Sequence, residues 1–460
     1  MAASGAALLE RIAIPGDDLA TDADGMLRIG GHRADDLLSR FGSPLFVTVE
    51  STIRQNYRAI RDAFEAHWPA GVDVFYAIKT NNALAIRAIL NQEGAGGECF
   101  GPAEYRATLE SGLPGDRIVV NGSDKSEDEL IEAARRGSIV NIDHEDEIAV
   151  LARVATAERP VRVNLRLKLH SEAFDVFDSA FFKSAEKISA VLSRAKWGHS
   201  LPAVIDLVKR IRATEGLRLL GYSCHVGRFS NLPEAAAVIA SEMAGAAKEI
   251  HAATGFWPEV LDLGGGWARR REPESRAPDA NPHTIEDYAA AVAAALTSAL
   301  ADRPLPRLWL EPGRYLVGNA VVLLATVGAV KQDLGLTWAH VDASTNLLMR
   351  IETSRSWYHV LPASRMHDAF STTADIVGPT CIPSLLAGDR PMPALARGDL
   401  VAVLDTGMYA EVISNQFNGM GRPANVLVSP GGAEVIRRRE TYEDIFGTHA
   451  IPDRLRKDAP

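Results

Sequence analysis

The chain is 460 residues long, about three times the length of a ~150-residue domain, although a single large domain can take ~250 residues. Two domains, one of them large, are therefore the starting expectation. Hydrophobic residues make up 47% and charged residues 23%, which excludes a disordered or collagen-like chain. The 49 Lys and Arg residues against 59 Asp and Glu residues give a net charge of −10, which argues against nucleic acid or an anionic membrane as partner.

The cysteines and the apolar runs bear on metal binding, cellular compartment and membrane association. Cys99, Cys224 and Cys381 cannot all pair and match no zinc spacing, so no metal is predicted and a reducing cytoplasm is the simplest compartment. Charged residues interrupt the first apolar stretch, which therefore does not resemble a secretory signal. The longest uncharged run, residues 315–330, is shorter than the ~20 residues that a membrane-spanning helix needs.

Between residues 70 and 320, short β-branched or aromatic stretches alternate with helical ones. The predicted strands are Asp73–Ile78, a segment ending at Glu98, Arg117–Val120, Ser138–Ile142, Val161–Leu167, Leu217–Cys224, Glu259–Leu263 and Arg307–Leu310. The predicted helices are Ala83–Gln92, Pro102–Ser111, Glu127–Arg136, Glu145–Arg153, Leu201–Thr214, an Ala-rich helix after His225, and Ile285–Leu300. Eight such strands over roughly 250 residues predict an α/β fold, a parallel (β/α)8 TIM barrel, with a doubly wound open sheet as the alternative.

The pattern changes after residue 320, where few helical stretches occur. Strands are predicted at Val321–Val330, Leu336–Val341, Asp375–Val377, Leu400–Leu404 and Ala424–Val428. Strand-like pieces also occur near the N-terminus, at Leu27–Ile29 and Pro44–Val47. We therefore expect three segments: an N-terminal segment (1–45) that joins the β domain, the barrel (46–318) and a C-terminal all-β domain (319–460).

Polar residues stand where the predicted barrel strands end. They are Lys79, Glu98, Asn121, Asp143, Arg166, His225, Gly264–Gly266 and Glu311. Active sites of this fold lie at the C-terminal ends of the strands, so these side chains are expected to converge on one site.

Four of these positions suggest a specific chemistry, although each also has a plain structural explanation. Lys79 closes an apolar strand and could form a Schiff base, or simply reach solvent. Three glycines after a strand (Gly264–Gly266) could admit a phosphate or form a tight turn. Glu311 could hold a cationic ring nitrogen or pair with Arg314, and His225 could stack on a ring or serve the fold. Together they meet the requirements of pyridoxal 5′-phosphate (PLP).

At these motifs the chain resembles the fold-type III PLP-dependent decarboxylases, the ornithine and diaminopimelate decarboxylase group with an alanine-racemase-like barrel. The resemblance runs from about Phe46 to Val428 and is closest to the diaminopimelate-decarboxylase-like branch. The motifs, in chain order, are FYAIKTN (Phe75–Asn81), HVG (His225–Gly227), DLGGG (Asp262–Gly266), EPGR (Glu311–Arg314), GPTC (Gly378–Cys381), GMYAE (Gly407–Glu411) and FNG (Phe417–Gly419).

The resemblance implies a role for each matching residue. Lys79 would carry the cofactor, His225 would stack on its ring, and Glu311 would meet the ring nitrogen. The other implied cofactor contacts are Glu98, Arg166, Gly264, Gly265, Gly266, Gly313, Arg314 and Tyr409. The resemblance also implies a homodimer with shared active sites, in which Lys79 comes from one chain and Cys381, as a catalytic thiol, from the other.

The same resemblance implies decarboxylation of an amino acid. Racemases of this fold place an Arg at the ring nitrogen, so Glu311 favours loss of CO2 by keeping that nitrogen protonated. The alternatives are an amino-acid racemase, an ornithine or lysine decarboxylase, and a non-catalytic PLP-binding relative. The retained Lys79 and Glu311 argue against the last of these.

The substrate is where the sequence departs from the family. Ile382 stands where diaminopimelate decarboxylases have an acidic residue, which removes the expected partner of a distal ammonium. Arg350 stands where those enzymes bind a distal carboxylate, but Ser354 replaces their Tyr; Arg314, Cys381 and Tyr409 are the other predicted substrate contacts. We therefore expect a substrate with a distal carboxylate: diaminopimelate, or a specialised-metabolism substrate such as citryl-diaminopropionate of siderophore pathways or carrier-bound glutamate.

Two further features have no assigned role. Arg228 follows HVG where the family usually has Ser, and it is a candidate contact for an anion. Residues 170–200 form a long insertion that contains Phe174, Phe177, Phe181 and Phe182, and this insertion is either a lid over a larger substrate or surface elaboration.

Overall fold

The computed structural model describes residues 3–177, 186–227, 232–273 and 281–456. The chain forms two compact units. One combines the N-terminal residues up to Ser51 with the C-terminal part from Asn319, and the other takes most of the chain between Thr52 and Gly318.

The second unit is a closed barrel of eight parallel strands in the order in which they occur along the chain, and β12 closes onto β5. The strands are β5 (Val72–Ala77), β6 (Gly96–Cys99), β7 (Ile118–Val120), β8 (Ile139–Ile142), β9 (Val161–Arg166), β10 (Leu217–Ser223), β11 (Val260–Asp262) and β12 (Arg307–Leu310). The predicted TIM barrel is confirmed, and the open-sheet alternative is wrong.

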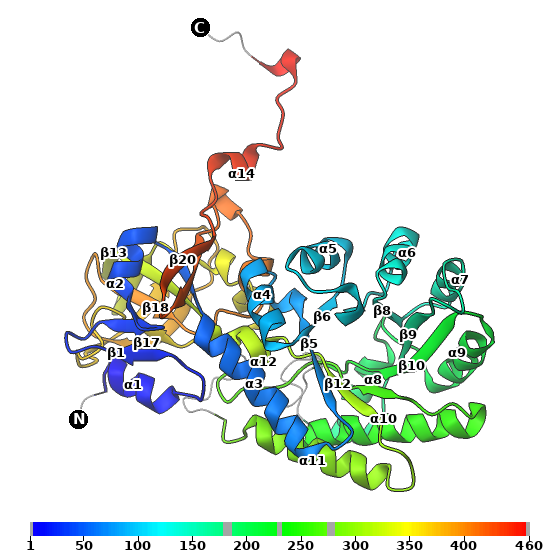
Figure 1. Ribbon diagram of the computed structural model, residues 1–460. Coiled ribbons are helices and arrows are strands. Elements are labelled where there is room, and N and C mark those ends of the chain that lie inside the picture. Colours follow the sequence, from blue (N-terminus) through cyan, green and yellow to red (C-terminus); the bar gives the residue numbers. More distant parts are fainter. Residues whose placement is uncertain (1–2, 178–185, 228–231, 274–280, 457–460) are drawn as a thin grey trace. The chain divides into compact units, whose positions relative to one another are not determined.

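Helices alternate with these strands and lie around them (Figure 1). They are α3 (Glu50–His67), α4 (Leu84–Glu93), α5 (Pro102–Glu110), α6 (Glu127–Arg135), α7 (Asp146–Ala152), α9 (Leu201–Ala213), α10 (Pro233–Thr254) and α11 (Ile285–Ala299). The short helices α8 (Ile188–Ser193) and α12 (Arg314–Val317) lie in the connections after β9 and β12.

Strand β6 shows how packing overrides strand propensity. Its first residue, Gly96, faces the ring of Phe75, and a Cβ at Gly96 would lie 2.3 Å from that ring. Phe75 in turn packs on Trp309, with ring centroids 4.8 Å apart. A strand that begins with two glycines is therefore required by the large aromatic side chain on the neighbouring strand.

The long insertion after β9 has a small core of its own. Phe174 is fully buried and packs with Ile188, Leu192 and Val226. Phe181 and Phe182, which the lid hypothesis needs, lie outside the described residues.

The first unit is built on a nine-stranded sheet in the order β17-β16-β14-β13-β4-β19-β20, with β18 pairing β13 and β15. The strands are β4 (Leu45–Val49), β13 (Val321–Asp333), β14 (Leu336–Val341), β15 (Val360–Leu361), β16 (Thr372–Val377), β17 (Ala387–Met392), β18 (Leu400–Val403), β19 (Ala424–Ser429) and β20 (Gly432–Arg437). Strand β4 is antiparallel to β13 and parallel to β19, so the N-terminal segment does join the β domain, as predicted. All of β4 lies in this sheet, which therefore takes in residues beyond position 45.

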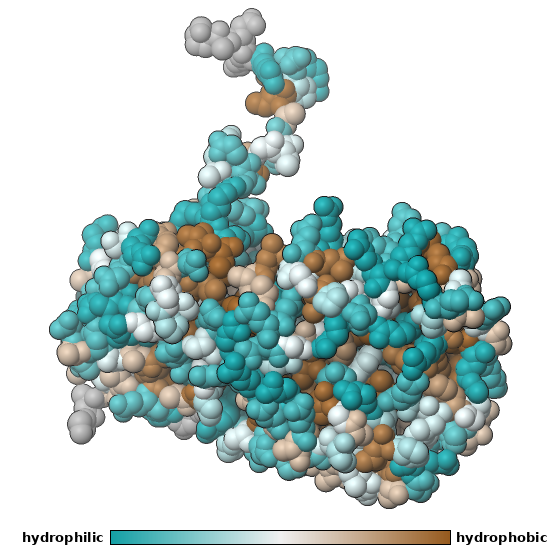
Figure 2. All heavy atoms as spheres, in the orientation of Figure 1, coloured by the Kyte–Doolittle hydropathy of each residue, from teal (hydrophilic) through white to brown (hydrophobic). Residues whose placement is uncertain are grey.

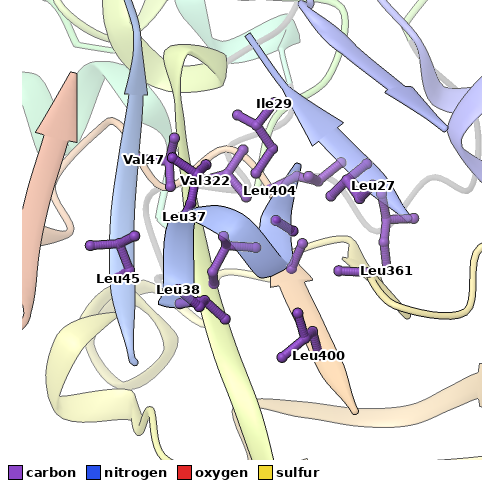
Figure 3. Packing of buried hydrophobic residues seen from close by; sticks show 14 of the residues in the cluster. Leu27, Ile29, Leu37, Leu38, Leu45, Val47, Val322, Leu361, Leu400 and Leu404 are labelled. Atoms are coloured by element: carbon purple, nitrogen blue, oxygen red, sulfur yellow. The ribbon is translucent and has the colours of Figure 1, made fainter. Parts of the chain in front are cut away.

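Alternation along β4 supplies both faces of this sheet. Leu45 and Val47 point into the cluster drawn in Figure 3, together with Leu37 and Leu404. Phe46, between them, belongs to the core on the opposite face. A single N-terminal strand thus contributes to two hydrophobic cores.

The β domain is mostly sheet, as predicted, and short helices accompany its strands. It contains the small sheet β1 (Leu19–Thr21), β2 (Leu27–Ile29) and β3 (His32–Arg33), and the helices α1 (Gly5–Ile12), α2 (Ala34–Phe41), α13 (Arg350–Ser354) and α14 (Tyr442–Phe446). At eight residues or fewer, these helices are too short to show a clear helical period. Strand β17 was missed because it contains Pro391, which is tolerated because β17 lies at the edge of the sheet.

Within the described part of the chain, no helix is long and apolar enough to cross a membrane. On the face drawn in Figure 2, hydrophobic side chains lie scattered among hydrophilic ones.

Candidate active site

The site begins at the C-terminal end of β5. Lys79 lies in the 3-10 turn that directly follows this strand, and its Nζ donates to Oε2 of Glu98 at 2.9 Å. The same ammonium lies 5.0 Å from the ring centroid of Phe100. Glu98 is in β6 and is fully buried. The predicted Lys79 and Glu98 are therefore direct partners at neighbouring strand ends.

Asn121, directly after β7, links this pair to Glu311, which follows β12. Its side-chain Nδ2 donates to Oε1 of Glu98 at 2.9 Å and to Oε1 of Glu311 at 3.0 Å. Its Oδ1 accepts from Nδ2 of Asn141 at 2.8 Å. Lys79, Glu98 and Glu311 thus belong to one hydrogen-bonded cluster.

Glu311 follows β12 and faces a second buried acid, Asp262, at the end of β11. Burial raises the pKa of Glu311 well above its usual range, and the charges of Asp262 and Glu98 raise it further. Burial also raises the pKa of Asp262 to about 7. Two carboxyl groups enclosed in this way retain a proton at neutral pH. We call Lys79, Glu98, Asn121, Asp262 and Glu311 the barrel cluster.

The glycine turn packs against this cluster. Gly264 and Gly266 have φ of +68° and +102°, and a Cβ on Gly265 would lie 2.5 Å from the carbonyl oxygen of Glu311. The backbone N–H of Gly264 donates to Oδ1 of Asp262 at 2.9 Å. Only glycines allow this close approach of backbone to strand ends.

His225, after β10, is held by the same turn. Its Nδ1 accepts the backbone N–H of Gly265 at 3.1 Å, so the ring proton lies on Nε2. Burial lowers the pKa of His225 well below its usual range, and nearby cations, Lys79 foremost, lower it further. The imidazole is therefore neutral, which suits the stacking role predicted for it.

Three other predicted residues line the same strand ends. Arg166 ends β9, is buried, and lies 5.7 Å from the ring centroid of Trp197. Gly313 lets β12 approach the turn of Lys79, because a Cβ there would lie 2.0 Å from Oγ1 of Thr80. Arg314 begins α12, and its guanidinium lies 3.9 Å from the carboxylate of Glu272.

The remaining candidates lie in the β domain. Arg350 is buried, its Nε donates to Oγ of Ser356 at 3.4 Å, and its guanidinium lies 5.3 Å from the ring centroid of Tyr409. Cys381 is exposed, and its backbone N–H donates to Oδ1 of Asn418 at 2.9 Å. The structure brings Arg350 and Tyr409 together, whereas no described contact joins Cys381 to either. Arg228 lies outside the described residues.

Comparison with known proteins shows which family the chain belongs to. Residues 50–318 match the family model described as pyridoxal-dependent decarboxylase, pyridoxal binding domain. The chain belongs to this family. It is also similar to two curated diaminopimelate decarboxylases: 32% identical to that of Methanothermobacter thermautotrophicus over 96% of this chain and 99% of that protein, and 31% identical to that of Bacillus subtilis over 92% and 94%.

A solved structure agrees over nearly the full length. The diaminopimelate decarboxylase of Methanocaldococcus jannaschii in complex with L-lysine has a TM-score of 0.86 at 26% identity, and the match covers 96% of this chain and 100% of that one. The chain is a PLP-dependent decarboxylase, a carboxy-lyase that acts on an amino acid, with PLP as cofactor. The predicted family, cofactor and reaction class are confirmed, and the racemase alternative is set aside.

The barrel of this decarboxylase fits PLP. A pocket beside the glycine turn is lined by Gly227, Gly265, Gly266, Trp267 and Tyr288, and by the first residues of α10. Backbone without side chains next to a helix N-terminus suits a phosphate. Lys79, the neutral His225 and Glu311 stand at barrel strand ends, where they would offer an amine, a flat ring and an acid to the cofactor.

Sequence reasoning missed two members of the barrel cluster as site residues. Asn121 was noted only as a strand-end residue, and Asp262 only as a letter in the glycine motif. The signal that could have found both is their place at strand ends of a closed barrel, where every strand end faces one centre. Asp143, also noted at a strand end, instead accepts the backbone N–H of Gly198 on Oδ1, and its own backbone N–H donates to Oε2 of Glu147 at 3.3 Å.

Proposed function

We propose that this decarboxylase removes CO2 from an amino acid with a distal carboxylate, with meso-diaminopimelate as the first candidate. The observation that carries the proposal is similarity along nearly the whole chain to proteins named diaminopimelate decarboxylase. The buried cation Arg350 beside Tyr409 supports it, since a guanidinium in such surroundings suits a carboxylate.

In this proposal each barrel residue has a separate role toward the cofactor. When bound, PLP supplies the electron sink for the bond between Cα and the carboxylate. Lys79 anchors the cofactor, and Glu98 orients the Lys79 ammonium. Glu311 keeps a proton at the ring nitrogen, and His225 supports the ring face. Gly264–Gly266, Gly313, Arg166, Arg314 and Tyr409 complete the proposed cofactor and substrate contacts.

A second candidate is a carboxylate-bearing substrate without a distal ammonium, such as citryl-diaminopropionate or carrier-bound glutamate. The observation that favours it is Ile382, an apolar residue directly after Cys381. An apolar side chain cannot hold an ammonium group as a carboxylate can.

A screen for CO2 release separates these candidates. The substrates are meso-diaminopimelate, L-lysine, L-ornithine, L-glutamate and citryl-diaminopropionate. We expect CO2 and L-lysine from meso-diaminopimelate. CO2 from citryl-diaminopropionate or L-glutamate alone would favour the second candidate, and CO2 from L-ornithine or L-lysine alone would contradict both.

We also propose a homodimer with shared sites in which Cys381 serves the partner's site as a proton donor. The exposed thiol supports this, and a reducing cytoplasm would keep it free. Mixing inactive Lys79→Ala and Cys381→Ala chains tests it. One intact site per mixed dimer should restore about a quarter of wild-type activity after random exchange. No recovery in mixtures shown to contain mixed dimers would contradict shared sites.

A further inference from the structure

Asn121 makes the contact that unites the barrel cluster. It is 4% exposed, and both N–H bonds of its amide are used, one on each carboxylate. The other carboxylate oxygen of Glu98 accepts a hydrogen bond from the Lys79 ammonium. The amide therefore stands between the carboxylate that orients the anchoring lysine and the carboxylate proposed for the ring nitrogen.

The orientation of this amide is fixed from behind. Asn141 donates to Oδ1 of Asn121 at 2.8 Å and is itself buried. With its oxygen engaged there, Asn121 can present only N–H groups to the two carboxylates. A reversed amide would place its oxygen against two acids and leave Asn141 without an acceptor.

The charges explain why a neutral double donor is useful at this position. Glu98, Asp262 and Glu311 are all buried within a few strand ends of one another, and Lys79 is the cation bonded directly to one of them. A hydrogen-bond donor favours the ionised form of each carboxylate that it contacts, without adding a charge of its own. Asn121 can thus hold two acids close together and keep both oriented.

We propose that Asn121 is a positioning residue that couples the lysine end of the active site to the ring-nitrogen end. By holding Glu98 and Glu311 on one amide, it sets the direction of both carboxylates and the ease with which Glu311 exchanges its proton. The inference rests on the proposed roles of Lys79 and Glu311 and assigns a positioning role to a residue whose amide bonds to Glu98, Glu311 and Asn141.

The decisive variant is Asn121→Asp in the PLP-loaded enzyme. The shape of the side chain is retained, but at high pH a third carboxylate faces the other two. At low pH the introduced group is protonated and can donate one hydrogen bond, as the amide does. We therefore expect kcat at pH 8 to fall about 10- to 100-fold and to recover in part toward pH 6, with KM within about threefold of wild type.

The absorbance spectrum of the bound cofactor gives a readout that does not depend on turnover. In Asn121→Asp its pH titration should shift relative to wild type, because the charge near the ring nitrogen has changed. Asn121→Ala, which removes the donor without adding charge, should lower kcat without the recovery at low pH. Asn91→Asp is the matched control: Asn91 lies in α4, donates to the carbonyl and hydroxyl of Ser111, and should keep the wild-type titration.

Two results would overturn the inference. One is that Asn121→Asp and Asn121→Ala both keep the wild-type kcat and the wild-type pH titration of the cofactor spectrum. The other is an equal loss of kcat at every pH in Asn121→Asp, with an unchanged spectrum, which would indicate a purely structural role. If wild-type enzyme binds PLP but releases CO2 from none of the substrates, the proposed function fails, and the spectral titration still tests Asn121.

Discussion

The barrel cluster and the Arg350 region of the β domain hold their side chains in different ways. In the barrel, Lys79, Glu98, Asn121 and Glu311 stand at the C-terminal ends of paired strands and bond to one another at 2.9–3.0 Å. In the β domain, Arg350 lies in a five-residue helix and contacts Ser356 and Tyr409 more loosely, at 3.4 and 5.3 Å.

This difference separates two tasks. Residues at the ends of barrel strands are fixed by neighbours on both sides, which suits chemistry that every substrate of the family requires. Residues on short helices and loops can change without disturbing a sheet, which suits the choice of substrate. Substitutions in the barrel cluster should therefore impair turnover and cofactor binding, and substitutions around Arg350 should impair substrate binding alone.

The sharpest test of the barrel side is Lys79→Ala. We expect kcat to fall at least about 1,000-fold and the visible absorbance band of the bound cofactor to disappear, because the proposed anchor is lost. Absorbance spectra after PLP loading and a CO2-release assay measure both. Lys248→Ala, which removes a surface lysine paired with Asp302, is the control. An unchanged spectrum in Lys79→Ala would mean that another residue anchors the cofactor.

A second variant tests how much Glu311, the acid proposed for the ring nitrogen, contributes to kcat. Glu311→Gln keeps the size of the side chain and removes its acid, so kcat should fall about 100-fold while PLP remains bound. Steady-state kinetics and the cofactor spectrum test this. Glu259→Gln, at an exposed pair with Arg218, should have no such effect. If Glu311→Gln keeps the wild-type kcat, the mechanism does not require the acid of Glu311.

The two regions also differ in how far the sequence predicts them. Lys79, His225 and Glu311 end apolar strands, so the strand pattern alone brings them to one rim. The bond between Asn121 and Glu311 joins residues 190 positions apart, and it exists only because the barrel closes. The sequence offers no signal for such a contact beyond the fold itself.

The short elements of the β domain that the sequence did not predict have a related cause. Helices α1 and α2 are eight residues each and derive their stability from packing on the sheet, with Leu9 and Leu37 in the same core. Intrinsic helical pattern is weak at that length, so tertiary contacts decide the structure. Strand β17 is accepted at an edge despite Pro391 for the same reason.

On the β-domain side, Arg350→Ala should raise KM for a substrate with a distal carboxylate about 10- to 100-fold, because a buried charge-assisted contact is lost. The cofactor spectrum should not change. Arg355→Ala, at an exposed residue five positions after Arg350, is the matched control. If KM for the true substrate is unaltered in Arg350→Ala, the distal carboxylate is bound elsewhere.

The smallest expected effect comes from Asp262, whose folded-state pKa is raised from 3.8 to about 7. Between these values the folded, cofactor-free protein keeps a proton that the unfolded chain has lost, so its stability falls as pH rises through this window. Asp262→Asn cannot ionise and should be more stable than wild type above pH 7, on the order of 1–4 kcal/mol or 5 °C in Tm, and equal to it below pH 4. Calorimetry across this range measures the difference, and parallel Tm profiles for the two proteins would show that Asp262 is ionised throughout.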